Sequence, residues 1–331
     1  MIPISIVTGF LGSGKTTLIS RILRDPAFAR TAVVVNEFGE IGLDHELIAT
    51  GDETFLTLTT GCLCCSVRSN LIETLLELNA RADGLFDRVL IETSGLADPA
   101  PILQALMTDG AVYATHVIDT MVTVVDPVHG EATLERYPEA RRQVALADRL
   151  VFSKTDLIEP NESLLNRIAS FNRTAPQSWA VDAGPELLFA GADPVARAAR
   201  LAMPPDHTGP SPFNRAQHTD GIETESLRRA KPMPALALSL WLQAMIEHCG
   251  DRLIRVKGIV ALEEMAWRPA IIHGVQHIFS PPEFLDRWPS ADTDTRLVFI
   301  FRDMPRHFPA RLLDAIEEEV REETAASRRT S

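Results

Sequence analysis

Short apolar runs separated by polar segments recur along the first half of the chain. They predict strands at residues 4–8, 32–36, 55–58, 88–92, 121–126 and 149–153. Leucines at helical spacing lie between some of these runs, and residues 134–147 predict one helix. Strands that are apolar throughout and alternate with helices are typical of a mostly parallel sheet covered by helices, so we expect an α/β fold.

The periodic pattern weakens after residue 185, where prolines and glycines become frequent. We therefore place the first domain at residues 1–185 and a linker at 186–213. A smaller C-terminal α+β domain is expected at residues 214–322, and a flexible polar tail at 323–331. Its expected elements are a helix ending near Gly250, strands at 253–260, 270–273 and 296–301, and a helix at 310–320.

Composition limits the partners that we expect. The chain has 331 residues, 45 of them acidic and 32 basic, which gives a net charge of -13. Such a surface generally repels nucleic acid and anionic lipid. No apolar run approaches the roughly 20 residues of a membrane span, and the first residues lack the charged segment of a signal peptide. We expect a cytoplasmic protein that binds neither nucleic acid nor membrane and keeps its thiols reduced.

The strongest motif lies at residues 9–16, which match G-x-x-x-x-G-K-[ST] between a strand and a helix and predict a P-loop NTPase domain. Its glycines let successive backbone N–H groups surround a phosphate. Lys15 is expected to reach the β- and γ-phosphates, and the Thr16 hydroxyl to bind Mg²⁺. The expected nucleotide-binding residues here are Gly9, Gly12, Ser13, Gly14, Lys15 and Thr16.

A second Mg²⁺ ligand is expected at the end of a neighbouring strand. Glu92 ends the strand at 88–92, and Gly95 follows three residues later. We expect Glu92 to bind or orient Mg²⁺ and the Gly95 N–H to reach the γ-phosphate, so Lys15, Glu92 and Gly95 are the predicted catalytic residues. The residue that activates water is not identified; the candidates are Glu37, Glu40 and Asp44.

The base is expected to contact residues 153–156, Ser-Lys-Thr-Asp, which resemble the Asn-Lys-x-Asp motif that reads guanine. The Asp156 carboxylate can accept hydrogen bonds from guanine, whereas adenine would leave it unsatisfied. The stem of Lys154 can lie over the base. Ser153 replaces the usual asparagine, so we expect GTP to be preferred with softened selectivity.

Three of the four cysteines lie within four residues, at Cys62, Cys64 and Cys65. They are too close for a comfortable disulfide, and thiolates favour Zn²⁺, Cu⁺ or an iron-sulfur centre. We expect a transferable Zn²⁺ here, with its fourth position open to water, to a partner or to Glu37. Cys249 ends an apolar helix pattern and is interpreted as a core residue.

Two histidines in the second domain, His273 and His277, are also considered. Their spacing places them on one face of either a strand or a helix. They are candidate metal ligands, although such pairs more often pack and form hydrogen bonds.

Together these segments resemble the CobW family of P-loop GTPases, metallochaperone relatives of the hydrogenase and urease nickel GTPases. The matching segments are residues 9–17, 35–40, 61–65, 92–99 and 153–156, and 273–277 with the prolines at 281–282 is similar to the family's C-terminal domain. The resemblance implies a GTPase that delivers Zn²⁺, or in some members Co²⁺, to a client metalloprotein. It adds Thr17 to the nucleotide-binding residues and supports Cys62, Cys64 and Cys65 as metal ligands. The linker carries only His207 and His218, so we expect metal transfer and no storage.

Other functions stay open on sequence alone. They are a cobalt-handling GTPase for cobalamin synthesis or cobalt-enzyme activation, a thiol-based metal or redox sensor, and a small-molecule kinase. A kinase would leave phosphate on an acceptor, whereas a GTPase releases it to water. A sensor would keep its function without Lys15. The sequence sets neither the client nor the oligomeric state, and a homodimer stays open.

Overall fold

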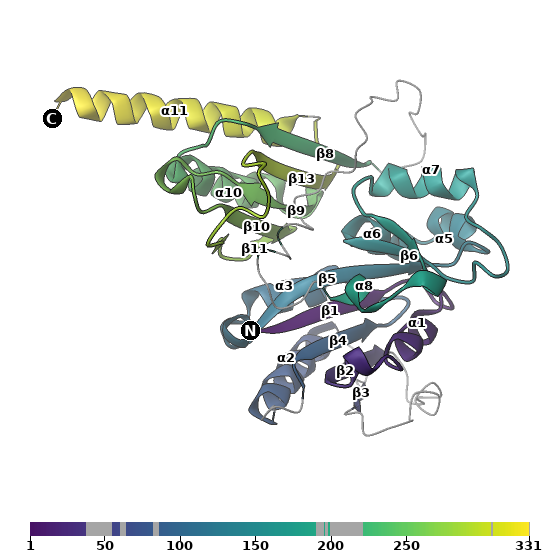
Figure 1. Cartoon of the computed structure of the whole chain (residues 1–331). Coiled ribbons are helices and arrows are strands. Elements are labelled where there is room, and N and C mark those ends of the chain that lie inside the picture. The colour runs from purple at the N-terminus through teal and green to yellow at the C-terminus, as the bar shows by residue number, and fades with distance from the viewer. Residues whose placement is uncertain are drawn as a thin grey trace. The chain divides into compact units, whose positions relative to one another are not determined.

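The structure, a computed structural model, describes residues 1–37, 55–59, 64–81, 86–189, 195, 198, 221–305 and 307–330 (Figure 1). Side chains are described for the same residues except 36, 37, 55–59, 64–70, 81, 185 and 328–330. The chain divides into two compact units, Met1–Ala192 and Asp193–Ser331. In the described part of the chain, no helix is long and apolar enough to cross a bilayer.

Within the described residues, the first unit contains a seven-stranded parallel sheet of order β3-β2-β4-β1-β5-β6-β7. This confirms the predicted α/β fold with a parallel sheet. The strands are β1 (Ile2–Thr8), β2 (Thr31–Glu37), β3 (Phe55–Thr59), β4 (Arg88–Thr93), β5 (His116–Val125), β6 (Arg149–Phe152) and β7 (Gln177–Trp179). Because β1 lies between β4 and β5, the segments that follow these three strands meet at one edge of the sheet.

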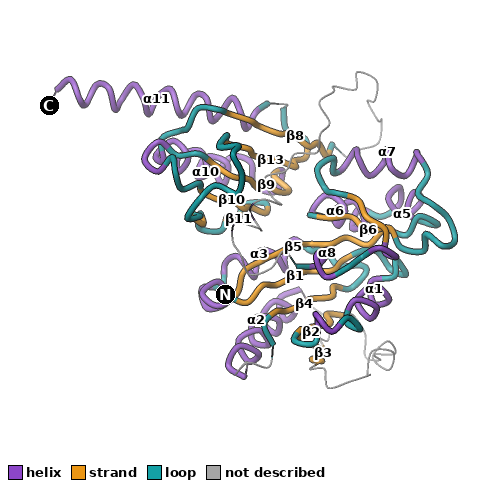
Figure 2. The backbone as a smooth tube through the Cα atoms, viewed as in Figure 1, coloured by secondary structure: helices purple, strands orange, loops and turns teal. Residues whose placement is uncertain are grey.

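Helices lie on both faces of this sheet (Figures 1 and 2). One face buries Leu18, Ile19 and Ile22 of α1 against alternate residues of the central strands, including Val122 and Val124. The helices are α1 (Lys15–Ile22), α2 (Cys64–Arg81), α3 (Ala100–Thr108), α4 (Gly110–Thr115), α5 (Gly130–Arg136), α6 (Pro138–Leu146), α7 (Glu162–Phe171) and α8 (Pro185–Leu188). Alternation along β5 directs Thr123 to the opposite face, where α6 packs.

The single helix predicted at residues 134–147 is wrong, because two helices occupy this stretch. Tyr137 has φ -115° and ψ 114°, an extended conformation between α5 and α6. Pro138 follows it as the first residue of α6. Proline clashes with a helical residue before it but fits the first turn of a helix, so it ends one helix and starts the next.

The described residues of the second unit form an antiparallel sheet of order β11-β10-β9-β13-β8, with β12 paired to β10. The predicted α+β domain is therefore confirmed. Its elements are β8 (Ile222–Arg229), α10 (Ala235–Cys249), β9 (Leu253–Val260), β10 (Ala270–Val275), β11 (Ile278–Phe279), β12 (Glu283–Phe284), β13 (Thr295–Arg302) and α11 (Phe308–Thr330). Trp241 of α10 is fully buried on one face of the sheet, and its Nε1 donates to the Pro309 carbonyl at 3.0 Å.

Two predicted boundaries need correction. Leu187, Leu188 and Phe189 are buried in the core of the first unit, so the linker does not begin at residue 186. The polar tail predicted from residue 323 is helical, because α11 continues to Thr330. Arg321 donates to Glu317 one turn earlier, at 3.0 and 2.7 Å, and such i, i+4 pairs stabilise a polar helix.

Asn161 offers a simple stability test in the first unit. Its Oδ1 accepts from the Leu164 N–H at 2.8 Å and caps the first turn of α7. We expect Asn161→Ala to lower the free energy of unfolding by about 1 kcal/mol in urea denaturation. Asn161→Asp keeps an acceptor at the cap and serves as the control. Equal losses in both variants would show that the cap does not stabilise α7.

Candidate functional site

The predicted phosphate loop connects β1 to α1. Gly9, Gly12 and Gly14 have φ values of 144°, 70° and 91°, and residues with a side chain rarely adopt such positive φ angles. A Cβ at Gly9 would lie 2.4 Å from the Val124 carbonyl oxygen, so the loop passes directly over β5. The backbone therefore adopts the curved form expected for a loop whose N–H groups bind phosphate.

Lys15 is the first residue of α1, and its side chain folds back over this loop. The side chain is 8% exposed, and its Nζ donates to the Gly9 carbonyl at 3.0 Å and the Phe10 carbonyl at 3.4 Å. The ammonium is therefore held over the loop, at the position from which a phosphate ligand would be contacted.

The two predicted Mg²⁺ ligands, Thr16 and Glu92, meet in the structure. The Thr16 hydroxyl donates to Glu92 Oε1 at 2.7 Å, although 76 residues separate them. Glu92 lies beside Val7 in the register of β1 and β4, and its side chain is 5% exposed. A hydroxyl and a carboxylate are oxygen donors of the kind Mg²⁺ prefers, so the residues present fit this ion.

Gly95 lies against the phosphate loop, as its predicted role requires. A Cβ at Gly95 would lie 2.6 Å from the Leu11 backbone nitrogen. Upstream, the Thr93 hydroxyl donates to the Thr8 hydroxyl at 2.7 Å, which joins the ends of β4 and β1. The segment after β4 and the phosphate loop are therefore held together.

The predicted base motif follows β6 and borders the same loop. A Cβ at Gly14 would lie 3.3 Å from the Cβ of Ser153, which is 5% exposed. Lys154 adopts φ 50°, and its Nζ donates to Asp126 Oδ2 at 2.7 Å. Asp156 is exposed to solvent, where a base could reach it. The structure thus brings Ser153 and Lys154 to the loop and leaves Asp156 at the surface.

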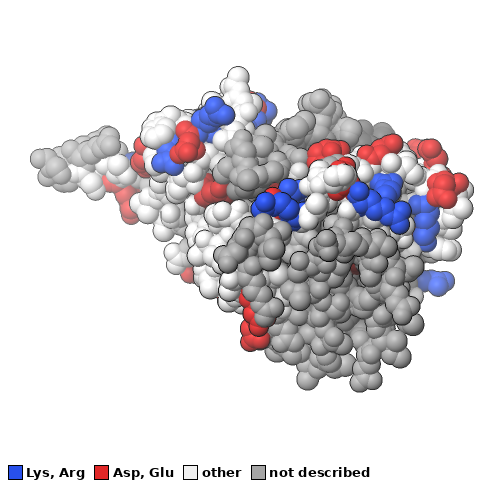
Figure 3. Space-filling model, turned by 60° about the horizontal axis from the view of Figure 1, so that its bottom comes forward, with Lys and Arg blue, Asp and Glu red and all other residues white. Residues whose placement is uncertain are grey.

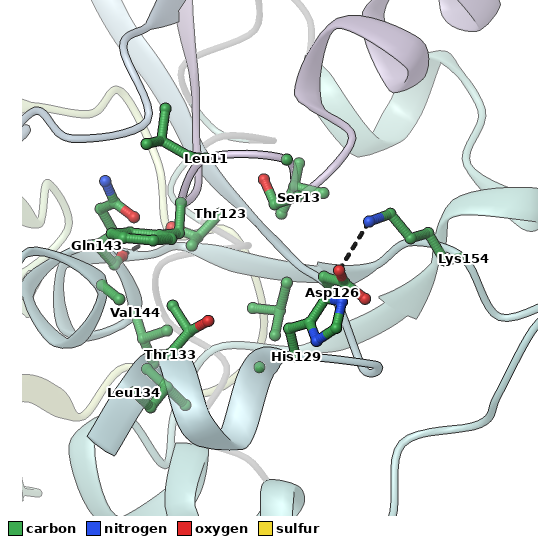
Figure 4. Close-up of a pocket in the computed structure, with 16 residues that line it drawn as sticks. Leu11, Ser13, Thr123, Asp126, His129, Thr133, Leu134, Gln143, Val144 and Lys154 are labelled. Carbon is green, nitrogen blue, oxygen red and sulfur yellow. Dashed lines mark hydrogen bonds and ion pairs between the residues drawn. The ribbon is translucent and has the colours of Figure 1, made fainter. Parts of the chain in front are cut away.

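A pocket of about 120 Å³ opens beside the phosphate loop (Figure 4). Its walls come from the loop, the end of β5, and α5 and α6; among its lining residues are Phe10, Leu11, Asp126, Gln143 and Lys154. Lys15, Thr16, Glu92 and Asp156 do not line it. The pocket therefore borders the loop on a different side from the predicted Mg²⁺ pair.

Asp126 and Gln143 are site residues that the sequence analysis missed. Asp126 directly follows β5, and its Oδ1 also accepts from the Val128 N–H at 2.8 Å. Gln143 is 1% exposed, and its Nε2 donates to the carbonyls of Gly95 and Ala97. A polar residue at a strand end was a usable signal for Asp126, whereas a glutamine on the apolar side of α6 indicates a buried amide but not its partners.

The thiolate motif is only partly described. Cys64 and Cys65 are the first residues of α2, and their side chains are not described. Cys62 lies outside the described residues, as do Glu40 and Asp44. Glu37 ends β2, with its backbone beside Thr59 of β3. The backbone therefore places Glu37 and the end of β3 at the same edge of the sheet as Glu92.

The two histidines of the second unit do not share a face. His273 lies in β10, where Arg255 Nη2 is 3.3 Å from its Nε2, whereas His277 follows the end of the strand at Val275. His277 lies 3.8 Å from the Asp251 carboxylate. Burial lowers the pKa of His273 well below its usual value, and the charges of Arg255 and Lys257 lower it further.

No cluster of three or more metal-binding side chains occurs within the described ranges, so this histidine pair receives no support as a metal site. The interpretation of Cys249 as a core residue is confirmed. It is 3% exposed, and its thiol lies 3.6 Å from the Met245 sulfur.

Charges of both signs lie next to one another on the face shown in Figure 3. Ion pairs of the first unit include Arg142–Asp98 at 2.6 Å and Lys154–Asp126 at 2.7 Å. Charge on this face therefore does not identify a partner.

Two family models match the chain: the CobW/HypB/UreG nucleotide-binding domain over residues 3–178 and the cobalamin synthesis protein cobW C-terminal domain over residues 222–317. The chain is 31% identical over 312 residues to the zinc chaperone YjiA of Escherichia coli, with 92% of this chain and 95% of that protein covered. It is 43% identical over 148 residues to the zinc chaperone CobW of Pseudomonas aeruginosa, with 42% and 39% covered.

Solved structures agree on the fold. The crystal structure of Zn(II)-bound YjiA GTPase from E. coli superposes with a TM-score of 0.69 at 24% identity, and covers 95% of this chain and 98% of that one. The family models together span both units, and the phosphate loop, Thr16–Glu92 pair and base motif all lie within the first match. The chain therefore belongs to the CobW/HypB/UreG family of P-loop GTPases and carries its nucleotide-binding domain together with a CobW C-terminal domain.

Proposed function

We propose that this protein is a metallochaperone that binds Zn²⁺ at Cys62, Cys64 and Cys65 and transfers it to a client metalloprotein under control of GTP hydrolysis. The observation that carries the proposal is that one unit contains both parts of such a protein. Cys64 and Cys65 begin α2, and the Thr16 hydroxyl lies 2.7 Å from Glu92, two oxygen ligands that Mg²⁺ can bind. The similarity to zinc chaperones over nearly the whole chain supports Zn²⁺ as the cargo.

In the proposed reaction, the protein holds GTP through its phosphate loop and base motif. Lys15 contacts the β- and γ-phosphates, and the loop N–H groups bind the phosphate oxygens. Lys154 and Asp156 contact guanine. Mg²⁺, held by Thr16 and Glu92, would neutralise charge on the phosphates. Gly95, which packs against Leu11 of the loop, would contact the γ-phosphate and so distinguish GTP from GDP.

Three thiolates suit a Zn²⁺ that must leave again, because a fourth position stays available to Glu37 or to a client ligand. Thiolates do not distinguish Co²⁺ from Zn²⁺ by type. The match to the C-terminal domain of a cobalamin synthesis protein therefore keeps Co²⁺ as a second cargo to test.

Nucleotide control is inferred from the position of the cysteines, which come after β3 in the sequence and include the first two residues of α2. β2 lies between β3 and β4 in the sheet, so a change at Glu92 or Gly95 on γ-phosphate loss can reach the end of β2 and the thiolate segment. Reordering of such segments on hydrolysis is an established switch mode. We propose that GTP holds the metal-retaining state and that hydrolysis loosens it.

Zn²⁺ affinity in the two nucleotide states tests this function. On reduced protein with Mg²⁺, chelator competition is expected to show about tenfold tighter Zn²⁺ binding with a non-hydrolysable GTP analogue than with GDP. Cys64→Ala is expected to abolish the difference, and Cys249→Ala, which changes a buried core thiol, to preserve it. If Zn²⁺ binds equally tightly with the GTP analogue and with GDP, and Co²⁺ does so too, nucleotide control is ruled out.

A further inference from the structure

We propose that Gln143 is a positioning residue for GTP hydrolysis, which holds the Gly95 segment where it senses the γ-phosphate. The inference rests on the proposed role of Gly95. Gln143 lies on α6, 48 residues from Gly95 in the sequence, and is 1% exposed. In Figure 4 it lies on the opposite side of the pocket from Lys154.

The amide of Gln143 makes two hydrogen bonds to the segment after β4. Its Nε2 donates to the Gly95 carbonyl at 3.1 Å and to the Ala97 carbonyl at 3.0 Å. Both N–H groups of one side-chain amide thus donate to backbone carbonyls of the segment that follows the predicted Mg²⁺ ligand Glu92. A turn bond from the Ala97 N–H to the Ser94 carbonyl, at 3.1 Å, closes the same segment.

Gly95 needs such a restraint because it has no side chain that neighbours could hold. Glycine samples more backbone conformations than any other residue. The Gln143 bond fixes the direction of the Gly95 carbonyl and so restricts the backbone on either side. Because a Cβ at Gly95 would lie 2.6 Å from the Leu11 nitrogen, small movements there would displace the phosphate loop.

Gln143 is itself anchored beside the phosphate loop. The hydroxyl of Thr123, 1% exposed in β5, donates to the Gln143 backbone carbonyl at 2.7 Å. Thr123 lies opposite Thr8, the last residue of β1 before the loop. The sheet beside the loop therefore fixes α6 at this point, and the Gln143 side chain transmits that position to Gly95.

The neighbouring residue makes a second, more exposed link. Arg142 Nη1 lies 2.6 Å from Asp98 Oδ2, and Asp98 Oδ1 accepts from the Ala100 N–H at 3.0 Å. This ion pair is partly screened by solvent. We therefore assign the precise placement of Gly95 to Gln143 and only general support of the segment to Arg142.

Gln143→Leu removes both N–H donors and replaces the amide with an apolar side chain of similar size. In the full-length protein, we expect about tenfold weaker binding of a non-hydrolysable GTP analogue and about tenfold lower kcat, with GDP affinity within about twofold of wild type. Fluorescent nucleotide titration and phosphate-release assays measure these quantities.

Asn172→Leu is the matched control. Asn172 is also a 1% exposed amide, and its Nδ2 donates to the Val144 and Ala147 carbonyls at 3.0 and 2.9 Å, so it holds the C-terminal end of α6 instead of the Gly95 segment. It should lower thermal stability at least as much as Gln143→Leu without changing the ratio of GTP-analogue to GDP affinity. An equal loss of discrimination in both variants would overturn the proposal, because general loosening of α6 would explain it.

Gln143→Glu supplies a pH readout of the donor role of residue 143. Burial raises the pKa of a carboxyl group, and only its protonated form can donate to the Gly95 or Ala97 carbonyl. Activity relative to wild type should therefore recover as pH falls through that pKa. A flat ratio across pH would overturn the role of the donor.

Gly95→Ala separates failure of this inference from failure of the proposed function. If Gly95→Ala leaves discrimination between GTP and GDP unchanged, Gly95 does not sense the γ-phosphate. Both the role of Gln143 and the proposed nucleotide control through Gly95 are then overturned. If Gly95→Ala removes discrimination while Gln143→Leu does not, only the role of Gln143 is overturned.

Discussion

Lys15→Ala is expected to lower kcat/KM for GTP hydrolysis by about 1,000-fold, the largest effect of any single substitution considered. The Lys15 ammonium is held 3.0 Å from the Gly9 carbonyl of the phosphate loop. Charge that develops on phosphate oxygens there would be stabilised by a cation fixed in advance, and removing one such group typically costs 10²- to 10³-fold. Phosphate release at several GTP concentrations measures the change.

Lys231→Ala controls for the loss of one lysine. Lys231 is exposed in the second unit, so its removal should leave kcat/KM unchanged. Circular dichroism of both variants checks that the fold is retained. If Lys15→Ala hydrolysed GTP at the wild-type rate, the loop would not be the site of phosphoryl transfer, and the cysteines would have to act without it.

Much of the fold was predictable because its strands are continuous apolar runs. β1 and β4 lie where the pattern predicts them, since a parallel strand buried on both faces is mostly apolar. β9 also lies at its predicted residues, although it carries Arg255 and Lys257 between its apolar positions. β7 was missed because its three residues are largely exposed and leave no such run. The break between α5 and α6 depends on one proline inside an otherwise helical pattern. The spacing of apolar residues does not indicate a helix break that one proline causes by steric clash.

Some residues of the candidate site could likewise be predicted from the sequence, and others could not. The positions of Lys15 and Thr16 at the phosphate loop were predictable because the whole motif occupies eight consecutive residues. Glu92 was predictable because it ends an apolar strand. Gln143 was not, since its role depends on contacts with residues 46 and 48 positions away. A glutamine between apolar positions of a helix carries no sign of which distant carbonyls it will meet.

Glu92→Gln should separate the charge of Glu92 from its hydrogen bond. Glutamine keeps a side-chain oxygen that can accept from the Thr16 hydroxyl, now at 2.7 Å, but it lacks the negative charge that attracts Mg²⁺. We expect about 100-fold lower kcat and a higher Mg²⁺ concentration at half-maximal rate, as measured by phosphate release across a Mg²⁺ titration. Excess Mg²⁺ should restore part of the rate.

Glu131→Gln is the control for this change, because Glu131 also accepts from a hydroxyl, that of Ser163, at an exposed position on α5. It should alter neither kcat nor the Mg²⁺ midpoint. An unchanged midpoint in Glu92→Gln with a lower kcat would place Glu92 outside the Mg²⁺ shell and make it a candidate for positioning the attacking water. A rate and midpoint equal to wild type would leave the pair with Thr16 as a structural link between β4 and α1, and Mg²⁺ would then need another carboxylate.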